Sequence, residues 1–525
     1  MSRDIVIVAE RLAESGLDRL RSAGFDVRDC SGVDRATLLA SVSDAKALIV
    51  RSATAVDREL LTHAPDLAVV TRAGVGLDNI DLAAATERGV LVANAPESNV
   101  LSAAEHTMGL ILALARNIPQ AHRSLVEGRW ERSKWEGVEL AGKTLAICGL
   151  GRIGSLVARR AKAFDLHVVG YDPYVSPERA RELGVELLSL ADAVAQADFL
   201  TVHLPRTRDT ENLINLALLR TAKPTLRVIN VARSGIINET DLDTALRDGI
   251  IAGAALDVFA TEPTTSSDLF THNNVVVTPH LGASTAEAQD RAGVAAADMV
   301  CLALSGEFVP FAVNSGIGKV AEATKPFIAL AERLGRVFAS YLDVLPHNLE
   351  VIVQGEIGAY APEPIGVAAL TGLLGRLSDR RVSAVNASAI AAELNMKFTT
   401  SSAAASHHGD YLNLVVVRAG RHSMAATLSG RRRQARIVMI DDHLTDVPPS
   451  RHLLVIKNND KPGAIGRVTS VLGNRGINIS NMGVGNTEEA GSAIMCITTD
   501  TEVADTVIDE LRLLEGIGEV KRVEG

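Results

Sequence analysis

The stretch TLAICGLGRIG, Thr144 to Gly154, predicts a strand that runs through a glycine-rich turn into a helix. Its first five residues are mostly apolar, as in a buried parallel strand, and residues 155–164 have the pattern of a helix. Gly149 permits a tight turn, Gly151 lets a phosphate approach the backbone, and Gly154 lets the helix pack closely on the strand. The N–H groups and partial positive charge at the helix N-terminus favour a bound pyrophosphate. A glycine turn without a ligand is the alternative.

The next apolar run supports dinucleotide binding. Residues 167–171 predict a second strand, which ends at Asp172. Dinucleotide folds place a carboxylate at this position, on the hydroxyl groups of the adenosine ribose. A carboxylate repels a 2′-phosphate, and no arginine follows Asp172 closely. The sequence therefore predicts NAD, rather than NADP, as the cofactor.

Composition and charge narrow the class of protein. The 525 residues are 47% hydrophobic and 22% charged, which predicts several folded domains. The net charge is −10 and no large basic segment occurs, which argues against nucleic acid as the main partner. The four cysteines are far apart and have no metal-ligand spacing, so we expect reduced thiols and no metal. The start lacks a signal-peptide pattern and the apolar run at 108–115 is too short to span a membrane, which predicts a cytoplasmic protein without a membrane segment.

Strands alternate with helices over the first 313 residues, which predicts an α/β fold with parallel sheets covered on both faces. We interpret residues 1–97 and 282–313 as a flavodoxin-like substrate-binding domain, with a Rossmann NAD-binding domain, residues 98–281, inserted into it. The two chain crossings would form a cleft for a substrate. The expected strands are 5–8, 47–50, 68–71, 90–93 and 309–313 in the first domain and 144–148, 167–171, 199–203, 227–231, 254–257 and 275–278 in the second.

The pattern changes after residue 313. Residues 314–448 show strands with fewer helices between them and are interpreted as an α+β intervening domain. The segment DVPPS, 446–450, has the composition of a linker. Residues 451–525 read as strand, helix, strand, strand, helix, strand, which is the ferredoxin-like order.

Three predicted strands end in polar turns that carry candidate catalytic residues. Arg233 follows the strand in VINVARSG, Glu262 lies in AALDVFATEP, and His280 lies in VVVTPHLGAST. The C-terminal ends of parallel strands share one sheet edge, so these side chains are expected to converge. Neutral histidine is a suitable general base near pH 7, and the arginine fork binds a carboxylate with two hydrogen bonds. Taken singly, they also suit a structural histidine, a turn glutamate and a surface arginine.

In this order and spacing, the motifs resemble the D-isomer-specific 2-hydroxyacid dehydrogenases over about the first 315 residues. The resemblance implies that His280 is the acid/base, Glu262 its partner, and Arg233 the clamp on the substrate's carboxylate and carbonyl oxygen. It also implies that Asp257 lies beside the nicotinamide carboxamide, and that backbone groups of Arg152 and Ile153 contact the pyrophosphate. Ser234 stands where many members have glycine, and we expect a modest effect on cofactor affinity.

The N-terminal domain offers candidate substrate contacts. Arg51 and Ser52 follow a predicted strand and suit a phosphate, one by charge and one by its hydroxyl group. Arg72 opens a turn in which Gly74 and its neighbour Gly76 free backbone N–H groups for a carboxylate. A basic cluster at 129–134 can approach the same anion. Each cluster alone is also compatible with a solvated surface.

The C-terminal segment resembles an ACT regulatory domain, through NNDKPG at 458–463 and GINIS at 476–480. The whole chain resembles the long members of the family, which oxidise 3-phospho-D-glycerate with NAD⁺ to 3-phosphohydroxypyruvate at the start of L-serine synthesis. That resemblance implies feedback by L-serine through Asp460 and Asn478, a homo-oligomer such as a tetramer, and a side activity on 2-oxoglutarate. Asp460 also suits a plain turn, and the two acids in DDH, 441–443, put a regulatory anion site in doubt.

Two other functions remain open at this point. One is a different D-2-hydroxyacid dehydrogenase, such as a glyoxylate or hydroxypyruvate reductase, although such enzymes normally lack the tail. The other is an NAD-sensing binding protein without catalysis, which would be expected to lose the histidine–glutamate pair.

Overall fold

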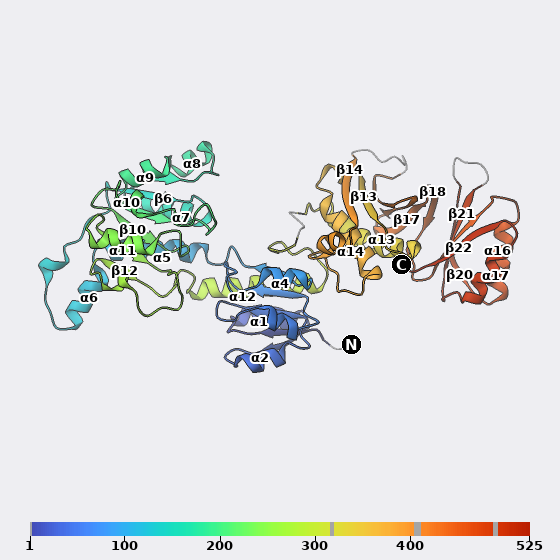
Figure 1. Ribbon diagram of the computed structural model, residues 1–525, viewed down its shortest axis with the longest axis horizontal. Helices are drawn as coiled ribbons and strands as arrows, with labels where there is room; N and C mark the ends of the chain where they lie inside the picture. Colours follow the sequence, from blue (N-terminus) through green and yellow to red (C-terminus); the bar gives the residue numbers. More distant parts are fainter. Residues whose placement is uncertain (1–2, 316–319, 404–410, 487–491) are drawn as a thin grey trace.

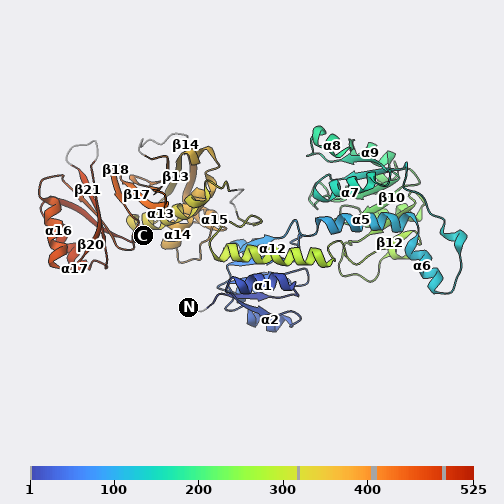
Figure 2. The same cartoon turned by 180° about the vertical axis from the view of Figure 1, so that it is seen from behind.

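The computed structural model describes residues 3–315, 320–403, 411–486 and 492–525. Four β-sheets follow one another along an elongated molecule (Figure 1). The sheet of β1–β5 occupies the middle, the sheet of β6–β12 lies at one end, and the two C-terminal sheets lie at the other (Figures 1 and 2).

The first sheet is parallel, with strand order β2-β1-β3-β4-β5, which confirms the flavodoxin-like prediction. Edge strand β2 was not predicted because its sequence, DVRD, is charged and largely exposed. The expected strand at 309–313 is wrong: only an isolated bridge from Ala312 to Ala93 forms there. The elements are β1 (Ile5–Val8), α1 (Glu14–Ser22), β2 (Asp26–Asp29), α2 (Arg35–Ser41), β3 (Ala47–Val50), α3 (Arg58–His63), β4 (Val69–Arg72), α4 (Leu82–Glu87) and β5 (Leu91–Asn94).

The second sheet is also parallel, with order β12-β11-β10-β9-β6-β7-β8, and confirms the Rossmann fold. The strand order reverses between β6 and β9, so a crevice opens beyond their carboxyl ends, where this fold binds ligands. Its strands are β6 (Thr144–Cys148), β7 (His167–Tyr171), β8 (Glu186–Leu187), β9 (Phe199–Val202), β10 (Arg227–Asn230), β11 (Gly253–Leu256) and β12 (Val275–Val277); its helices include α7 (Arg152–Lys162), α8 (Pro177–Leu183), α9 (Leu190–Gln196), α10 (Leu216–Leu219) and α11 (Glu239–Arg247).

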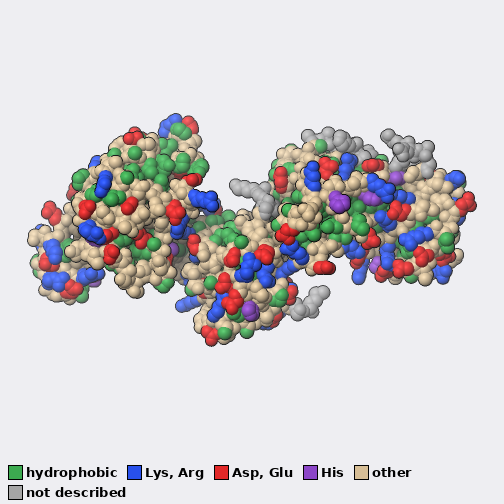
Figure 3. Space-filling model, in the orientation of Figure 1, with side chains coloured by type: hydrophobic (Ala, Val, Ile, Leu, Met, Phe, Trp, Pro, Cys, Tyr) green, Lys and Arg blue, Asp and Glu red, His purple; other side chains and the backbone are tan. Residues whose placement is uncertain are grey.

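Two long helices run between these lobes, α5 (Val100–Ala115) and α12 (Ala286–Leu304) (Figures 1 and 2). Helix α12 returns to the first lobe and packs on α1, where Gly16 faces Gly293 so closely that a Cβ on Gly16 would lie 2.8 Å from the Gly293 carbonyl group. Figure 3 shows the surface hollowed between the lobes of β1–β5 and β6–β12. The cleft expected from two chain crossings therefore lies beside α5 and α12.

The C-terminal part contains a six-stranded and a four-stranded sheet. In the first, order β14-β13-β15-β16-β17-β18, helices α13 and α14 pack backbone to backbone at Gly335 and Gly372, more helix than the sequence suggested. The second, order β20-β21-β19-β22, confirms the ferredoxin-like prediction. The elements are α13 (Lys325–Leu342), β13 (Asn348–Gly355), α14 (Glu363–Leu377), α15 (Ala387–Glu393), β14 (Lys397–Ala403), β15 (Asn413–Ala419), β16 (His422–Ser429), β17 (Gln434–Ile440), β18 (His443–Val447), β19 (Leu453–Asn458), α16 (Ala464–Asn474), β20 (Ile479–Asn486), β21 (Ala493–Thr499), α17 (Asp505–Arg512) and β22 (Ile517–Val523).

Within the described ranges, no helix combines the length and apolar character needed to cross a bilayer. The same residues contain no group of three or more His, Cys, Asp or Glu side chains arranged to hold a metal ion.

Candidate active site

The glycine turn between β6 and α7 has the geometry that a dinucleotide requires. Gly149 has φ = 97°, and a Cβ there would lie 2.6 Å from the carbonyl oxygen of His203. Gly154 packs against the Gly149 carbonyl oxygen with no room for a side chain. Over Gly151, by contrast, nothing lies within 4 Å of the Cβ position, so space is open above the first turn of α7. The N–H groups of Arg152 and Ile153 face this end of the helix without intrahelical partners, so the residues present fit a pyrophosphate.

Asp172 follows β7 and holds the same turn. Its carboxylate accepts hydrogen bonds from the N–H of Leu150 at 2.8 Å and from the N–H of Tyr174 at 2.9 Å. The side chain therefore lies beside the glycine turn, at the strand end where the sequence placed a ribose contact. That contact stays a prediction.

His280 and Glu262 form a hydrogen-bonded pair. Nδ1 of His280 lies 2.6 Å from one carboxylate oxygen of Glu262, and the other oxygen accepts the N–H of Phe259 at 2.9 Å. A carboxylate has no proton to donate, so Nδ1 carries the hydrogen and Nε2 is left as a proton acceptor. The imidazole is 49% exposed, and no hydrogen bond among the described residues involves its Nε2.

Glu239, the first residue of α11, supports this pair and was not found from the sequence. Its carboxylate accepts the N–H of Ala260 at 2.6 Å, next to the N–H that Glu262 accepts. Burial raises the pKa of Glu239, and the charge of Glu262 raises it further. The only sequence signal was an acidic residue at a helix start, which commonly serves as a cap.

Asp257, which follows β11, has a buried carboxylate that accepts hydrogen bonds from other residues of the chain. One carboxylate oxygen accepts hydrogen bonds from His106, Thr278 and the N–H of Leu281, the other accepts the N–H of Gly282, and the side chain is 1% exposed. Burial raises the pKa of Asp257, but these hydrogen bonds lower it below its ordinary value. A contact with the nicotinamide carboxamide stays a prediction.

Two arginines from different lobes converge on the backbone of Gly76. A Cβ on Gly76 would lie 2.7 Å from Nη1 of Arg72 and 2.8 Å from Nη2 of Arg233. The Asp78 carboxylate lies at the same point, 2.8 Å from that Cβ position. Burial lowers the pKa of Arg72 and the charges of the neighbouring arginines lower it further, so the net shift is downward despite the opposing charges of Asp78 and Glu10. Such a partly buried cluster of guanidinium groups attracts an anion. The structure thus brings together the predicted residues Arg233 and Arg72.

The turn that carries Arg51 and Ser52 is shaped by Glu10, which sequence reasoning missed. Glu10 accepts N–H groups of Arg51 at 2.9 Å, Ala53 at 3.2 Å and Thr54 at 2.9 Å. Nε of Arg72 donates to the carbonyl oxygen of Arg51 at 3.0 Å, so Arg51 and Arg72 share one site. The glutamate lies 41 residues from Arg51 in sequence, and no local pattern links them.

Other predicted contacts are not brought to this site. The N–H of Gly74 is bonded to the carbonyl oxygen of Arg72 at 2.8 Å, so its role toward a carboxylate stays a prediction. The basic segment 129–134 follows α6 (Ile118–Val126), on the side of the β6–β12 lobe that lies away from β1–β5 (Figure 1). Asp460 and Asn478 are exposed on the last domain, and no described hydrogen bond joins them.

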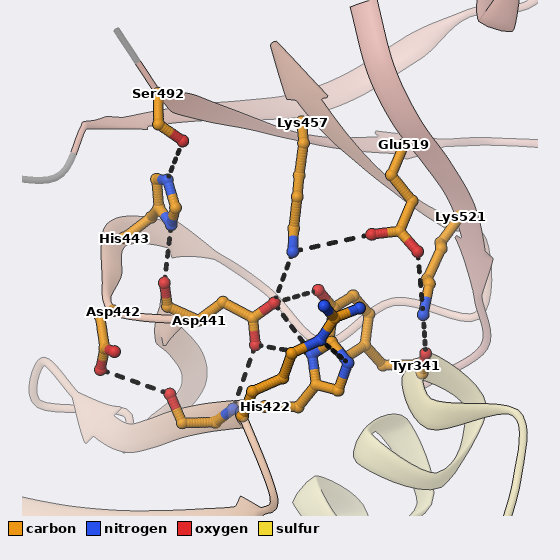
Figure 4. A network of polar contacts seen from close by, with 11 residues as sticks. Tyr341, His422, Asp441, Asp442, His443, Lys457, Ser492, Glu519 and Lys521 are labelled. Atoms are coloured by element: carbon orange, nitrogen blue, oxygen red, sulfur yellow. Dashed lines mark hydrogen bonds and ion pairs between the residues drawn. The ribbon is translucent and has the colours of Figure 1, made fainter. Parts of the chain in front are cut away.

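A polar network joins the two C-terminal domains (Figure 4). Asp441, in the turn between β17 and β18, accepts hydrogen bonds from Lys457 of β19 at 2.7 Å, Tyr341 of α13 at 2.6 Å and His422 of β16 at 3.1 Å. Lys521 of β22 donates to the Tyr341 carbonyl oxygen at 2.9 Å and lies over its ring. The two acids at 441 and 442 therefore differ: Asp441 neutralises lysine within the protein, while Asp442 is exposed.

Three family models match successive parts of the chain. Residues 108–282 match the NAD binding domain of the D-isomer specific 2-hydroxyacid dehydrogenases, residues 323–441 the D-3-phosphoglycerate dehydrogenase intervening domain, and residues 452–516 the ACT domain.

Curated relatives match over nearly the full length. The D-3-phosphoglycerate dehydrogenase of Mycobacterium tuberculosis (strain ATCC 25618 / H37Rv) is 47% identical over 97% of this chain and 96% of its own. That of Methanocaldococcus jannaschii is 39% identical over 98% of both chains. Among solved structures, the TT0316 protein of Thermus thermophilus has a TM-score of 0.55 and 33% identity over 59% of this chain and 99% of that chain. An NADPH-dependent glyoxylate/hydroxypyruvate reductase of Sinorhizobium meliloti has a TM-score of 0.53 and 29% identity over 61% of this chain and 100% of that chain.

Proposed function

Because this chain belongs to the family of D-3-phosphoglycerate dehydrogenases, we propose that the site around His280 oxidises 3-phospho-D-glycerate at C2 to 3-phosphohydroxypyruvate. This is the first step of L-serine biosynthesis. The observation that carries the assignment is the His280–Glu262 hydrogen bond of 2.6 Å, placed at the same sheet edge as the glycine turn.

His280 acts as the general base in this reaction. Its free Nε2 takes the proton of the C2 hydroxyl group, and Glu262 stabilises the imidazolium that forms. Bound NAD⁺ supplies the hydride acceptor. Because the Nδ1–H group already donates to Glu262, Nε2 is unprotonated and can accept the proton without a change of tautomer.

The arginine cluster orients the substrate. Arg233 binds the substrate carboxylate and the developing carbonyl oxygen, and Arg72 adds positive charge to the same anion site. Arg51 and Ser52 hold the phosphate, and backbone N–H groups near Gly74 complete the carboxylate site. Two anionic groups at the ends of the substrate thereby fix C2 between the two lobes.

The cofactor contacts follow from the glycine turn. The N–H groups of Arg152 and Ile153 hold the pyrophosphate over Gly151, and Asp172 accepts hydrogen bonds from the ribose hydroxyls. The negative charge of Asp172 selects NAD against NADP.

L-Serine is the proposed effector, bound to the ACT domain with Asp460 on its amino group and Asn478 as a polar contact. A homo-oligomer, with a tetramer as the family expectation, is supported by the apolar surface of α6 and its following loop. There Ile118 is 53%, Leu125 57%, Val126 73% and Trp130 82% exposed. The four free cysteines support a reducing, cytoplasmic location.

The paired His280 and Glu262 argue against a binding protein without catalysis. The test is to incubate the full chain with NAD⁺ and 3-phospho-D-glycerate and follow NADH absorbance with a hydrazine trap for the product. L-Serine, or NADH with 2-oxoglutarate, added in separate runs tests the effector and the side activity.

In that assay His280→Asn should lower kcat by about 10²- to 10⁴-fold, the usual contribution of general acid–base catalysis. Asparagine tolerates the left-handed backbone that His280 adopts, φ = 55°, so the turn is retained. NAD⁺ affinity, measured by calorimetry, should stay unchanged. Wild-type turnover in this variant, or no turnover of 3-phospho-D-glycerate by the wild type, would contradict the proposal.

A further inference from the structure

Asp257 accepts three hydrogen bonds from the turn that carries His280, whose N–H also lies 3.0 Å from the Thr278 carbonyl oxygen. The carbonyl oxygen of Asp257 accepts the N–H of His280 at 2.9 Å, one carboxylate oxygen accepts that of Leu281 at 2.7 Å, and the other accepts that of Gly282 at 2.8 Å. Three consecutive N–H groups therefore depend on Asp257. Since His280 has a positive φ, its orientation relies on these bonds rather than on local backbone preference.

His106, on α5, donates to this carboxylate from the other side. Its Nε2 lies 3.2 Å from the Asp257 carboxylate and 3.1 Å from the Thr278 hydroxyl oxygen. The Thr278 hydroxyl donates its own hydrogen to Asp257 at 2.6 Å, so both neighbours of Nε2 are acceptors and Nε2 must carry a hydrogen. Among the described residues, His106 is the only basic side chain within ion-pair distance of Asp257.

One face of helix α5 contacts both the turn that carries His280 and the start of α12. Ser102 and His106 lie four residues apart on that face. Ser102 shares a hydrogen bond of 2.8 Å with Thr285, the N-cap of α12, while His106 binds the Asp257–Thr278 pair. Of these two contacts, the one from His106 reaches the residue that holds the turn of His280, whereas the one from Ser102 reaches only the start of α12.

From these contacts we propose that His106 is a positioning residue for proton transfer at His280. Its Nε2–H keeps the buried Asp257 carboxylate oriented toward the N–H groups of the 281–282 turn. Without that donor, the carboxylate keeps the Thr278 hydroxyl and the two N–H groups but loses its contact with α5, so the turn shifts and the imidazole of His280 moves away from the C2 hydroxyl group. The inference rests on the proposed function of His280 as the base.

The test compares His106→Leu, which removes the donor, with His106→Gln, whose amide N–H reaches the position of Nε2. We expect kcat of His106→Leu to fall about 10- to 100-fold, since small displacements of a catalytic group cost this much. His106→Gln should stay within about threefold of the wild type by the same argument. KM for 3-phospho-D-glycerate and the Kd of NAD⁺ should change much less than kcat in both, because the arginine cluster and glycine turn are untouched.

Two further measurements separate positioning from a structural role. With substrate deuterated at C2, the isotope effect on kcat should rise in His106→Leu because the chemical step has slowed. The matched control is Ser102→Ala, one turn earlier on the same face, which breaks the bond to Thr285 but leaves Asp257 intact. It should retain kcat within about twofold, since no hydrogen bond between described residues joins Ser102 to Asp257 or its donors.

Wild-type kcat in His106→Leu, or a His106→Gln variant as slow as His106→Leu, would overturn the inference. So would an equal loss of NAD⁺ affinity or an unchanged isotope effect in the slow variant. His280→Asn serves as the reference in the same assay. If that variant also turns over normally, the assignment of the base has failed; if only His106→Leu does, the positioning role alone has failed.

Discussion

At the scale of single residues, the functional turns are shaped by carboxylates that accept backbone N–H groups. Glu10 holds the turn of Arg51, Glu239 supports the loop of Glu262, and Asp257 holds the turn of His280. Burial raises the pKa of Glu10, but three backbone N–H donors bring it below its ordinary value. By accepting these N–H groups, the carboxylates fix the backbone of the turns that carry Arg51, Glu262 and His280.

Replacing Asp172 tests cofactor selection at this scale. We expect Asp172→Gly to weaken NAD⁺ binding by about 10- to 100-fold, the range for losing hydrogen bonds to a charged group. NADP⁺ binding should weaken less, or improve, because the repulsion of its 2′-phosphate is removed. Steady-state KM values for both cofactors measure the ratio, and Asp192→Gly, on the exposed side of α9, is a control. An unchanged preference for NAD⁺ would remove Asp172 from the account.

At the scale of elements, the glycine turn must satisfy two separate requirements, close packing of α7 on β6 and room for a bound phosphate. Gly154 is required by packing, because the Gly149 carbonyl oxygen occupies the space of a side chain. Gly151 faces open space, so the fold itself tolerates a side chain there and only a bound phosphate requires its absence. One motif therefore contains a structural glycine and a binding glycine.

Two substitutions separate these demands. Gly154→Val should destabilise the domain by about 1–3 kcal/mol, the usual cost of overpacking, and lower NAD⁺ affinity with it. Gly151→Ala should keep the thermal midpoint while NAD⁺ affinity falls, because its φ of −67° suits alanine. Calorimetric unfolding and NAD⁺ titration of both variants give the comparison. Equal midpoints for Gly154→Val and the wild type would show that the close packing is dispensable.

At the scale of the whole molecule, the polar network around Asp441 links the last two domains (Figure 4). Burial raises the pKa of Asp441, but hydrogen bonds from Lys457 and Tyr341 lower it below its ordinary value. The ionised form is therefore favoured in the folded protein. Its stabilisation is present above the ordinary aspartate pKa and is lost as pH falls through the lowered pKa.

Asp441→Asn should thus destabilise the C-terminal domains at pH 7. In acid, the free energy of unfolding of the variant should approach that of the wild type. Lys457 is 30% exposed and also lies 3.6 Å from Glu519, so the loss at pH 7 should be about 1.5–3 kcal/mol, the range for a hydrogen bond to a charged group. Calorimetric unfolding at pH 7 and near pH 3 measures it. Asp442→Asn is the matched control, since Asp442 is exposed and, within the described part of the chain, has one hydrogen bond, from Ser423 at 3.5 Å. A constant difference between variants across pH would contradict the electrostatic explanation.

The sequence by itself determined the four domain folds and most strands of the two parallel sheets. It also placed Arg233, Glu262 and His280 at one sheet edge. These features depend on periodic apolar runs, glycine spacing and the rule that parallel strands end at a common edge, all of which are local or topological. The charged edge strand β2 could not be predicted, because it buries too little apolar surface to show a periodic apolar pattern in the sequence.

Only the tertiary structure decided which side chains support the catalytic ones. His106 meets Asp257 across 151 residues, Ser102 meets Thr285 across 183, and Arg72 and Arg233 converge from separate lobes. Such contacts depend on strand register, helix orientation and the placement of two domains at once. A single side chain carries no periodic signal of a partner that distant, so its role emerges only when packing brings the two together.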